Sequence, residues 1–417
     1  RVRPGSDGAL ALGMARHLVD KDLVDQDFVN NYSHGYAEFE AYLRNSVTVE
    51  WASEICGLPA DVIRQLAEEF TAVNPATVWI GYGMQRHVNG GANVRAIDAF
   101  VAMTGNIGIE GGGARYGHLQ TWGYNYHGMM QKPPVGSVGM KGAGGPVGEF
   151  VSDSGEKSEY SDRALNINQT AQGILDASEP PVRMLWVASK NPFAQDFDRN
   201  KMVKAFDKLE MVVCVDQFFN ETVQHADIVL PVTTTFEQWD VSSSYWHYWL
   251  SVNEPAIKPL YECKSDPEIA ALLSKTINKL EPGSCTFPQE FNAKRWLDQE
   301  FNEAMGKQFG IAGWDDLLEG PRKAKMVSTA AWYDRKFKTP SGKYEFKSER
   351  CAENGHTALP EYKAGAKGAL PFHLFTPHLQ YGLHSQFVNL DWMQVFWPEP
   401  FVYIHPFAAQ KKGITEG

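Results

Sequence analysis

The sequence predicts an α/β protein with two open, mostly parallel sheets of the Rossmann-like type, followed by the start of a β-rich C-terminal segment. Three observations predict this class. Helices with one apolar face alternate with short apolar strands, the strands end in glycine or polar residues, and one helix joins Val182–Ser189 to Met211–Val215. Two strands joined by one helix within about 30 residues form a parallel strand–helix–strand unit, whose crossover is expected to be right-handed. A chain of 417 residues is long enough for roughly two to four domains.

The first region, residues 1–113, contains helices with apolar residues at every third or fourth position. Ser6 and Asp7 form a helix N-cap signal, and Gly105 ends the last helix of the region as a C-cap. The apolar run Ala76–Ile80 predicts a strand that opens onto a glycine turn. The predicted helices cover about residues 7–20, 59–74 and 91–104.

The second region, residues 114–290, carries the strand–helix–strand unit, and a glycine-rich insertion over 109–161 leads into it. The insertion combines dense glycine with scattered aromatic residues and shows no periodicity. This texture favours a functional loop, and a mobile insertion without function is the alternative. The continuous apolar strands that follow are typical of a buried parallel sheet. The predicted elements are strands over 182–189, 211–215 and 227–231, a helix between the first two strands, and a helix over 264–280.

The rest of the chain divides into a connecting segment, 291–365, and a C-terminal segment, 366–417. The connecting segment shows only loops and short elements. New strands are expected around Pro371–Thr376 and Phe401–His405. We interpret residues 366–417 as the start of a further, β-rich domain that the sequence cuts off, and the whole chain as an internal fragment of a longer polypeptide.

Composition and charge exclude several classes of protein. The chain has 39 Lys and Arg against 50 Asp and Glu, a net charge of −11 without a basic cluster, so nucleic-acid binding is not expected. No apolar run reaches the roughly 18–20 residues that span a bilayer. The five cysteines are scattered without a C-x-x-C pair, which excludes the usual zinc and iron–sulfur spacings within this chain. Cys214 lies inside an apolar run and is expected to be a core residue.

Glycine and polar residues follow three of the predicted strands. They form the segments Gly81–Arg86, Ser189–Pro192 and Asp216–Gln217. Open α/β sheets bind ligands at the carboxyl ends of their strands, and glycine lets a phosphate approach the backbone. An aspartate at such a position can accept hydrogen bonds from a base amine or from ribose hydroxyls. Each segment alone is equally consistent with an ordinary turn, but together they predict a large nucleotide-like ligand.

Two further features leave alternatives open. His378 and His384 share one predicted loop, where two imidazoles can bind a metal but more often form ordinary hydrogen bonds. Asp216 can contact a ligand or simply cap the turn that follows its strand. No nucleophile-elbow motif and no zinc-protease helix motif is present in the sequence.

A set of short segments, spread over nearly the whole chain, is more specific than any one of them. The segments are Arg3–Leu12, Gly81–Arg86 with Thr104–Gly108, Asn191–Pro192, Asp216–Thr222, Ala226–Pro231 and Thr339–Lys343. In this order they resemble the catalytic subunits of the molybdopterin-guanine-dinucleotide oxidoreductases, the dimethyl sulfoxide reductase family. Ile404–Ala409 resembles the entry to the family's C-terminal β-barrel, so residues 366–417 would be the truncated start of that barrel.

The resemblance implies a protein that holds two molybdopterin guanine dinucleotides on one molybdenum or tungsten atom. The residues implied to contact one dinucleotide are Gly5, Ser6, Asp7, Gly81, Gly83 and Gln85. Those implied to contact the other are Asn191, Asp216 and Thr222, with His384 and Ser385 close to a pterin. Asp7 and Asp216 suit the amino edge of guanine. No catalytic residue and no metal ligand is expected in this chain, because both would lie before Arg1 in the family pattern.

The resemblance also implies two-electron oxidoreductase chemistry at the metal. The string Thr376–Gln386 favours reduction of a sulfoxide, a sulfur oxyanion or a similar oxo acceptor. A formate dehydrogenase-like enzyme, a non-catalytic structural relative and a generic nucleotide-binding module are the alternatives. An iron–sulfur cluster is expected before Arg1, and the fragment alone is expected to be inactive. The expected partners are a small-molecule substrate, an iron–sulfur electron-transfer subunit and a membrane-anchor subunit, with a periplasmic or membrane-associated location favoured over a cytoplasmic one.

Overall fold

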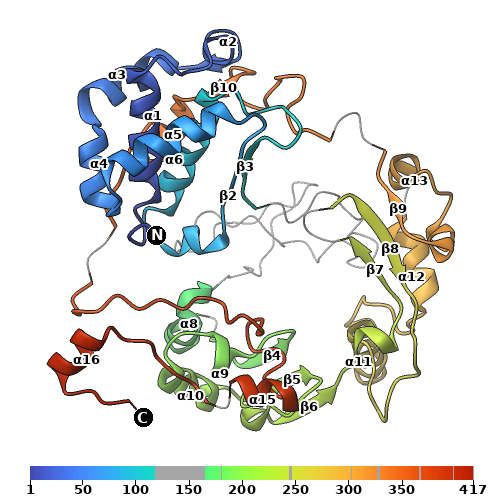
Figure 1. Ribbon diagram of the computed structural model, residues 1–417. Coiled ribbons are helices and arrows are strands. Elements are labelled where there is room, and N and C mark those ends of the chain that lie inside the picture. The colour runs from blue at the N-terminus through green and yellow to red at the C-terminus, as the bar shows by residue number, and fades with distance from the viewer. Residues whose placement is uncertain are drawn as a thin grey trace.

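The structure is a computed structural model that describes residues 1–117, 165–179, 181–243, 247–301, 303–325, 329–365, 368–397 and 399–416. Within these residues helices and short parallel strands form a mixed α/β fold, which confirms the predicted class. Figure 1 shows a largely helical first unit, a second unit around a parallel sheet and a third unit around an antiparallel sheet. Most of the predicted insertion 109–161 lies outside the described residues.

The first unit packs its helices around α1, which is rich in alanine and glycine. Small residues allow close approach, since a Cβ on Gly13 would lie only 2.4 Å from the Cβ of Ala52 in α4. Leu12, Leu18 and Phe39 are fully buried in the continuous core that results. The helices of this unit are α1 (Asp7–Asp20), α2 (Gln26–Asn31), α3 (Tyr36–Ser46), α4 (Val49–Cys56), α5 (Ala60–Ala72) and α6 (Gly90–Met103).

The helices predicted in this region are α1, α5 and α6, and the three short helices between α1 and α5 were not predicted. Asp25 precedes α2, and its carboxylate accepts the N–H of Phe28 at 2.8 Å. Thr48 precedes α4, and its hydroxyl accepts the N–H of Trp51 at 3.0 Å. These are ordinary N-caps. α6 ends just before Gly105, which has φ +72° as a C-cap glycine does.

Two short parallel pairs complete the first unit. The pairs are β1 (Ser33–His34) with β10 (Tyr344–Glu345) and β2 (Thr77–Trp79) with β3 (Gly113–Arg115). β2 is the strand predicted at 76–80. The β1–β10 pair returns part of the connecting segment to the first unit, where Phe346 stacks on Phe39 at 5.3 Å between ring centroids. The sequence gives no local signal for this pairing, because the two strands are distant along the chain.

The second unit contains the parallel sheet that the sequence predicts. Its strands are β4 (Met184–Ala188), β5 (Met211–Asp216) and β6 (Ile228–Pro231), hydrogen-bonded in that order. Val187, Val212 and Cys214 point to one face and pack with Ile174 of α8 and Phe206 of α10. The helices are α8 (Thr170–Asp176), α9 (Pro192–Gln195) and α10 (Arg199–Lys208). Burial, and then the charge of the nearby carboxylate at the end of β5, raise the pKa of the Cys214 thiol to about 11, as suits a core residue.

The third unit is an antiparallel sheet that was not predicted. It consists of β7 (Asp240–Ser243), β8 (Trp249–Asn253) and β9 (Arg322–Lys323). Leu250 of β8 is fully buried against Met305, Phe309 and Leu317 from the helices that cover the sheet. The helices are α11 (Asp266–Leu280), which is the predicted one, α12 (Ala293–Glu300), α13 (Glu303–Phe309) and the 3₁₀ helix η5 (Trp314–Glu319).

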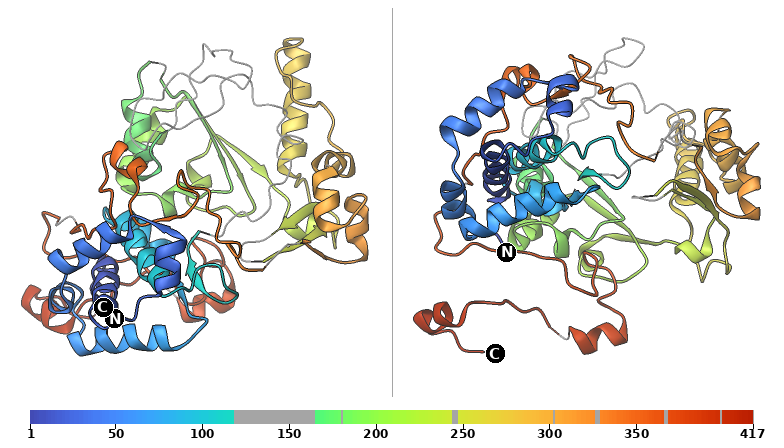
Figure 2. Two further views of the ribbon diagram at one scale, coloured as in Figure 1. Left: turned by 90° about the horizontal axis from the view of Figure 1, so that it is seen from above. Right: turned by 45° about the horizontal axis from the view of Figure 1, so that its top comes forward.

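The C-terminal segment runs between the first and second units as a long connection and carries short helices (Figures 1 and 2). The prediction of strands around Pro371–Thr376 and Phe401–His405 is wrong, since these residues pair with no other strand in the described part of the chain. A strand needs a neighbour for its N–H and C=O groups. The helices from 349 onward are α14 (Glu349–Glu353), α15 (Asp391–Phe396) and α16 (Pro406–Lys412). None of the described helices is both long and apolar enough to cross a membrane.

Candidate cofactor site

The first group of predicted residues lies where two helices begin side by side. α1 starts at Asp7 and α6 at Gly90, and the two helices pack against each other. Asn93 of α6 connects them, because its Oδ1 accepts the N–H of Gly8 at 3.2 Å and its Nδ2 donates to the carbonyl of Gly5 at 3.2 Å. The first N–H groups of a helix are unpaired and carry the positive end of its dipole. Two adjacent helix starts therefore favour an anionic ligand.

Asn89, just before α6, holds the loop at Gly5 from the inside. Its side chain is buried, and its Nδ2 donates to the carbonyls of Gly5 at 2.8 Å and Lys363 at 2.6 Å. Its Oδ1 is buried without a hydrogen-bond partner among the described residues. Gly5 has φ +73°, and a Cβ there would lie 3.2 Å from Nδ1 of His87. The loop thus requires glycine, and an unsatisfied acceptor lies beneath it.

Two glycines of the next loop leave the backbone open. Gly81 and Gly83 lie at the start of the 3₁₀ helix η1 (Tyr82–Arg86), which follows β2 and contacts the start of α6. A Cβ on either glycine would meet no atom within 4 Å. Gln85 is exposed, and its Oε1 accepts the hydroxyl of Tyr116 at 3.2 Å. Open backbone next to two helix starts suits a phosphate-bearing ligand.

Ser6 and Asp7 differ in what they offer a ligand. Ser6 is 3% exposed, and its hydroxyl donates to the carbonyl of Arg3 at 2.5 Å, so the expected side-chain cap of α1 does not form. Asp7 is half-buried in the first turn of α1, and its carboxylate accepts no hydrogen bond from another described residue. The structure therefore leaves the Asp7 carboxylate available and the Ser6 hydroxyl engaged. We call the residues around the starts of α1 and α6 (Gly5, Ser6, Asp7, Gly81, Gly83 and Gln85) the first cluster.

The second group of predicted residues joins the carboxyl ends of β4 and β5. Asn191 follows β4, and its Oδ1 accepts the hydroxyl of Thr222, which follows β5, at 2.6 Å. Oγ1 of Thr222 also accepts the N–H of Phe193 at 3.2 Å. Thr222 is 1% exposed. The side-chain pair thus fixes the two strand ends relative to each other, at the edge where open α/β sheets bind ligands.

Asp216, the last residue of β5, is engaged locally. Its Oδ1 accepts the N–H of Phe218 at 3.0 Å, and its Oδ2 accepts Nδ2–H of Asn220 at 2.8 Å. This is the capping arrangement that the sequence left open as the alternative. A carboxylate offers about four lone-pair sites, so both oxygens retain capacity for a ligand donor. Contact with guanine stays a prediction.

The C-terminal segment brings His384 and Ser385 to these strand ends. Oγ of Ser385 accepts Nε2–H of Gln195 at 3.4 Å, and Oε1 of Gln195 accepts the N–H of Asn191 at 3.0 Å. The rings of His378 and His384 lie 5.6 Å apart, edge to face. No group of three or more His, Cys, Asp or Glu side chains that could hold a metal occurs among the described residues. We call Asn191, Asp216, Thr222, His384 and Ser385 the second cluster.

One segment connects the two clusters. The ring of His373 lies 6.2 Å from the ring of His87, which borders Gly5 of the first cluster. Ser385, twelve residues further on, belongs to the second cluster. Residues 373–385 therefore run from one cluster to the other. Twelve residues span at most roughly 40 Å when fully extended. The two clusters are thus within reach of one elongated ligand system.

Sequence reasoning missed three residues that build the clusters, Asn89, Asn93 and Gln195. The first two are four positions apart at the start of α6, a spacing that places both on one helix face. That spacing at the start of the helix was the available signal. Gln195 gave none, because its partner Ser385 lies 190 positions further along the chain.

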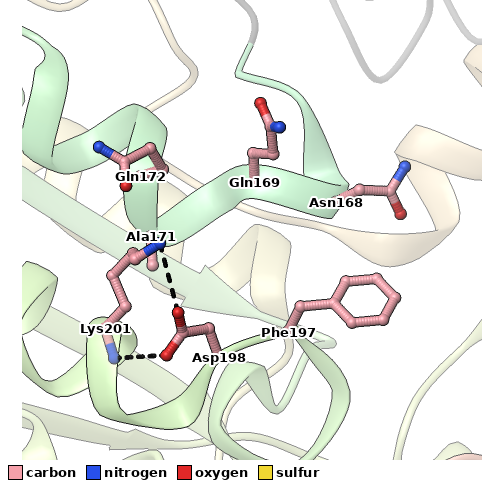
Figure 3. Close-up of a pocket in the computed structure, with 7 residues that line it drawn as sticks. All are labelled: Asn168, Gln169, Ala171, Gln172, Phe197, Asp198 and Lys201. Carbon is pink, nitrogen blue, oxygen red and sulfur yellow. Dashed lines mark hydrogen bonds and ion pairs between the residues drawn. The ribbon is translucent and has the colours of Figure 1, made fainter. Parts of the chain in front are cut away.

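A small hollow of about 230 Å³ lies apart from the clusters, between the 3₁₀ helix η2 (Ile167–Gln169), α8 and the start of α10 (Figure 3). Its charged groups satisfy each other. The carboxylate of Asp198 accepts the N–H of Lys201 at 3.1 Å and pairs with its Nζ at 3.3 Å. Asp198 is the N-cap of α10, so this hollow is explained as a capped helix start.

Two polar clusters, one at helix starts and one at strand ends of an α/β fold, are the kind of site where such folds bind polar or phosphate-bearing ligands. The family model for molybdopterin oxidoreductases matches residues 1–276. The chain therefore belongs to the molybdopterin oxidoreductase family, whose members are enzymes that carry a molybdopterin cofactor. The first cluster fits such a cofactor, since its glycines and helix starts supply an anion site and the Asn89 side chain beneath it has an unpaired buried acceptor.

Similar proteins include reductases of small oxidised molecules. The chain is 31% identical over 460 residues to the dimethyl sulfoxide/trimethylamine N-oxide reductase of Cereibacter sphaeroides, with all of this chain and 54% of the relative covered. It is 29% identical to the trimethylamine-N-oxide reductase of Haemophilus influenzae, with the same coverage. Acetylene hydratase from Pelobacter acetylenicus has a similar fold, with a TM-score of 0.70 and 20% identity, covering all of this chain and 59% of that one. The chain spans about half the length of the curated relatives it matches.

Proposed function

We propose that this chain is the cofactor-holding part of an enzyme that binds two molybdopterin guanine dinucleotides with molybdenum or tungsten. The observation that carries the proposal is the pair of polar clusters, at two helix starts and at two strand ends, joined by residues 373–385. The first cluster consists mainly of glycines at helix starts, and the second mainly of amide and hydroxyl side chains, with Asp7, Asp216 and His384 as the exceptions. Such groups position a polar ligand, whereas acid–base catalysis uses histidines and carboxylates with matched pKa values.

The first cluster would hold one nucleotide tail. The starts of α1 and α6 and the open backbone at Gly81 and Gly83 favour its diphosphate. The carboxylate of Asp7, which has no other described hydrogen-bond donor, suits the amino edge of guanine. Gly5 and Ser6 would contribute backbone, and Gln85 would lie along the cofactor.

The second cluster would hold the other nucleotide tail. Asn191 and Thr222 would present their joined side chains at the ends of β4 and β5, and Asp216 would accept the N–H groups of the second guanine. His384 and Ser385 would approach a pterin, since their loop is held against Gln195.

When bound, the cofactor supplies two-electron chemistry at its metal, and the residues of this chain bind and orient it. None of them is assigned to the metal or to a catalytic role. Reduction of a sulfoxide, a sulfur oxyanion or a similar oxo acceptor is the reaction we favour, because the relatives are named as dimethyl sulfoxide and trimethylamine N-oxide reductases. The whole enzyme would also contain an iron–sulfur cluster and assemble with an electron-transfer subunit and a membrane anchor, in the periplasm or at the membrane.

The test uses the full-length protein, purified after growth with molybdate or tungstate. We expect bound metal and oxidation of a reduced viologen dye when dimethyl sulfoxide or trimethylamine N-oxide is added. Formate oxidation without reduction of these acceptors would favour the formate dehydrogenase-like alternative. A protein that contains neither metal would favour a non-catalytic relative and contradict the proposal. Cell fractionation and co-purification test the location and the partner subunits.

A further inference from the structure

A lysine beside the second cluster plays no part in the function proposed above. Lys190 follows β4 and lies between Ser189, whose φ is +53°, and Asn191. Its Nζ lies 2.8 Å from Oδ2 of Asp196, the residue that ends α9. The Asp196 side chain is 6% exposed and the Lys190 side chain 31%. A nearly buried carboxylate therefore holds the ammonium at a fixed place next to Asn191.

The Lys190–Asp196 pair is less exposed to solvent than a neighbouring ion pair. Arg199 and Glu221 also pair at 2.8 Å, but their side chains are 56% and 48% exposed, so solvent screens them. The Lys190 pair is partly withdrawn from water, which strengthens its electrostatic interactions. A lysine ammonium has three N–H donors, and among the described residues Lys190 gives one, to Asp196. It retains donors for a further acceptor.

The loop that carries Lys190 is tied to the binding residues on both sides. Asn191 accepts the hydroxyl of Thr222, and Gln195 bonds both the N–H of Asn191 and the hydroxyl of Ser385. The ammonium therefore lies at the ligand-binding edge of the sheet. The chain as a whole has a net charge of −11, so a local cation at this edge favours an anionic ligand there.

We infer that Lys190 donates to a phosphate oxygen of the nucleotide tail held by the second cluster, with Asp196 as its positioning residue. The inference rests on the proposed function, because the phosphate belongs to the proposed cofactor. Lysine binds phosphate as a point charge, and a charge-assisted hydrogen bond is roughly twice as strong as a neutral one. The ion pair with Asp196 explains why the Lys190 ammonium is held in one place.

The experiment compares variants of the full-length protein for guanine nucleotide content after purification and for binding of guanosine diphosphate to the cofactor-free form. Lys190→Met is expected to weaken diphosphate binding roughly tenfold, the size of one charge-assisted hydrogen bond, and to lower the nucleotide content. Lys190→Arg keeps the charge and should retain most of both. Lys204→Met, an exposed lysine on α10, is the matched control and should behave as wild type.

Asp196→Asn separates binding from support of the loop. The amide oxygen can still accept an N–H of the Lys190 ammonium, so the lysine stays in place while a negative charge beside the phosphate is removed. Guanosine diphosphate should therefore bind as well as to wild type or better. If Asp196→Asn and Lys190→Met lose guanosine diphosphate binding equally, the ion pair supports the loop structure and the inference is overturned. If Lys190→Met folds poorly, a loss of binding in Asp196→Asn gives the same answer. Wild-type protein without guanine nucleotide would overturn the proposed function as well, whereas full loading of Lys190→Met would overturn only the role of Lys190.

Discussion

The two clusters are assembled in different ways. In the first, the buried amides of Asn89 and Asn93 bond directly to backbone groups of the Gly5 loop and the α1 start. In the second, the Asn191 and Thr222 side chains bond to each other at the ends of two strands. The Gly5 loop of the first cluster is thus supported by buried side chains of the protein core, whereas the second cluster lies at a sheet edge.

The two clusters therefore depend on the rest of the fold in different ways. Buried side chains that satisfy backbone groups contribute to the free energy of folding, and losing one leaves unpaired groups behind. Asn191 and Asp216 at the sheet edge are only half-buried, so water reaches the groups that a substitution there leaves unpaired, and the cost is lower. Substitutions in the first cluster should therefore act mainly on stability, and those in the second mainly on binding.

Asn93→Ala is expected to have the largest effect on stability. It removes the acceptor for the Gly8 N–H and one donor to the Gly5 carbonyl, both buried, and should lower the free energy of unfolding by about 2–4 kcal/mol. Urea denaturation measures the change. Asn30→Ala, an exposed asparagine of α2, is the control and should change stability little. Equal effects of the two variants would show that the amide does not hold the helix starts together.

Asp98 of α6 gives the first unit a dependence on pH. Burial raises the pKa of its carboxyl to about 7 in the folded protein, from an ordinary value of 3.8. The folded state then binds more protons than the unfolded state between about pH 4 and pH 7, so stability falls as pH rises through this window and stays lowered above it. Asp98→Asn should remove this loss and stabilise the protein at pH 8 by on the order of 2–3 kcal/mol.

The measurement is thermal or urea unfolding of both proteins at several pH values. Near pH 4 the two should be almost equally stable, because the native carboxyl is then neutral as the amide is. Asp207→Asn, an exposed substitution on α10, should follow wild type throughout. A gain that is the same at pH 4 and pH 8 would mean that the burial of charge is not its cause.

Thr222→Val tests the second cluster by removing its central hydroxyl. The variant loses the hydrogen bond to Asn191 and leaves the Phe193 N–H unpaired, so we expect a loss of about 1–2 kcal/mol, less than for Asn93→Ala. Thr222→Ser keeps the hydroxyl and should recover most of the stability in the same denaturation assay. A larger loss than for Asn93→Ala would reverse the comparison between the clusters.

Asp216→Asn should affect stability least and binding clearly. The amide oxygen can still accept the Phe218 N–H, and only the hydrogen bond from Asn220 is lost, so the cofactor-free protein should lose about 1 kcal/mol. The amide presents a donor where guanine also donates, so purified full-length protein should lose cofactor and metal. Melting temperature and metal content are measured on the same samples. Full metal content in the variant would assign Asp216 to turn capping alone.

The sequence predicted what depends on local pattern. α1, α5 and α6 and the strands β4, β5 and β6 follow from apolar periodicity and from capping residues. The β8–β9 and β1–β10 pairs depend on contacts between distant segments, for which the sequence has no local signal. β7 and β8 are close along the chain, and their antiparallel pairing was missed although it is local. Extended residues around Pro371–Thr376 show the converse, because an apolar run becomes a strand only where a neighbour pairs with it.

The candidate site divides along the same line. Glycines after strands and the aspartate that ends β5 could be found from the sequence, because turns and strand ends have recognisable residues. The supporting amides could not, since Asn93 bonds Gly8 across 85 positions and Gln195 bonds Ser385 across 190. The engagement of the Ser6 hydroxyl with the Arg3 carbonyl was equally invisible, because a serine before a helix usually caps it.

The central claim is that the two clusters hold one guanine nucleotide each. The most direct test is the ratio of guanine nucleotide to metal in the full-length protein, with the nucleotide released by acid and counted by chromatography and the metal counted by mass spectrometry. We expect two guanine nucleotides per molybdenum or tungsten atom. A ratio near one, or metal without guanine nucleotide, would contradict it.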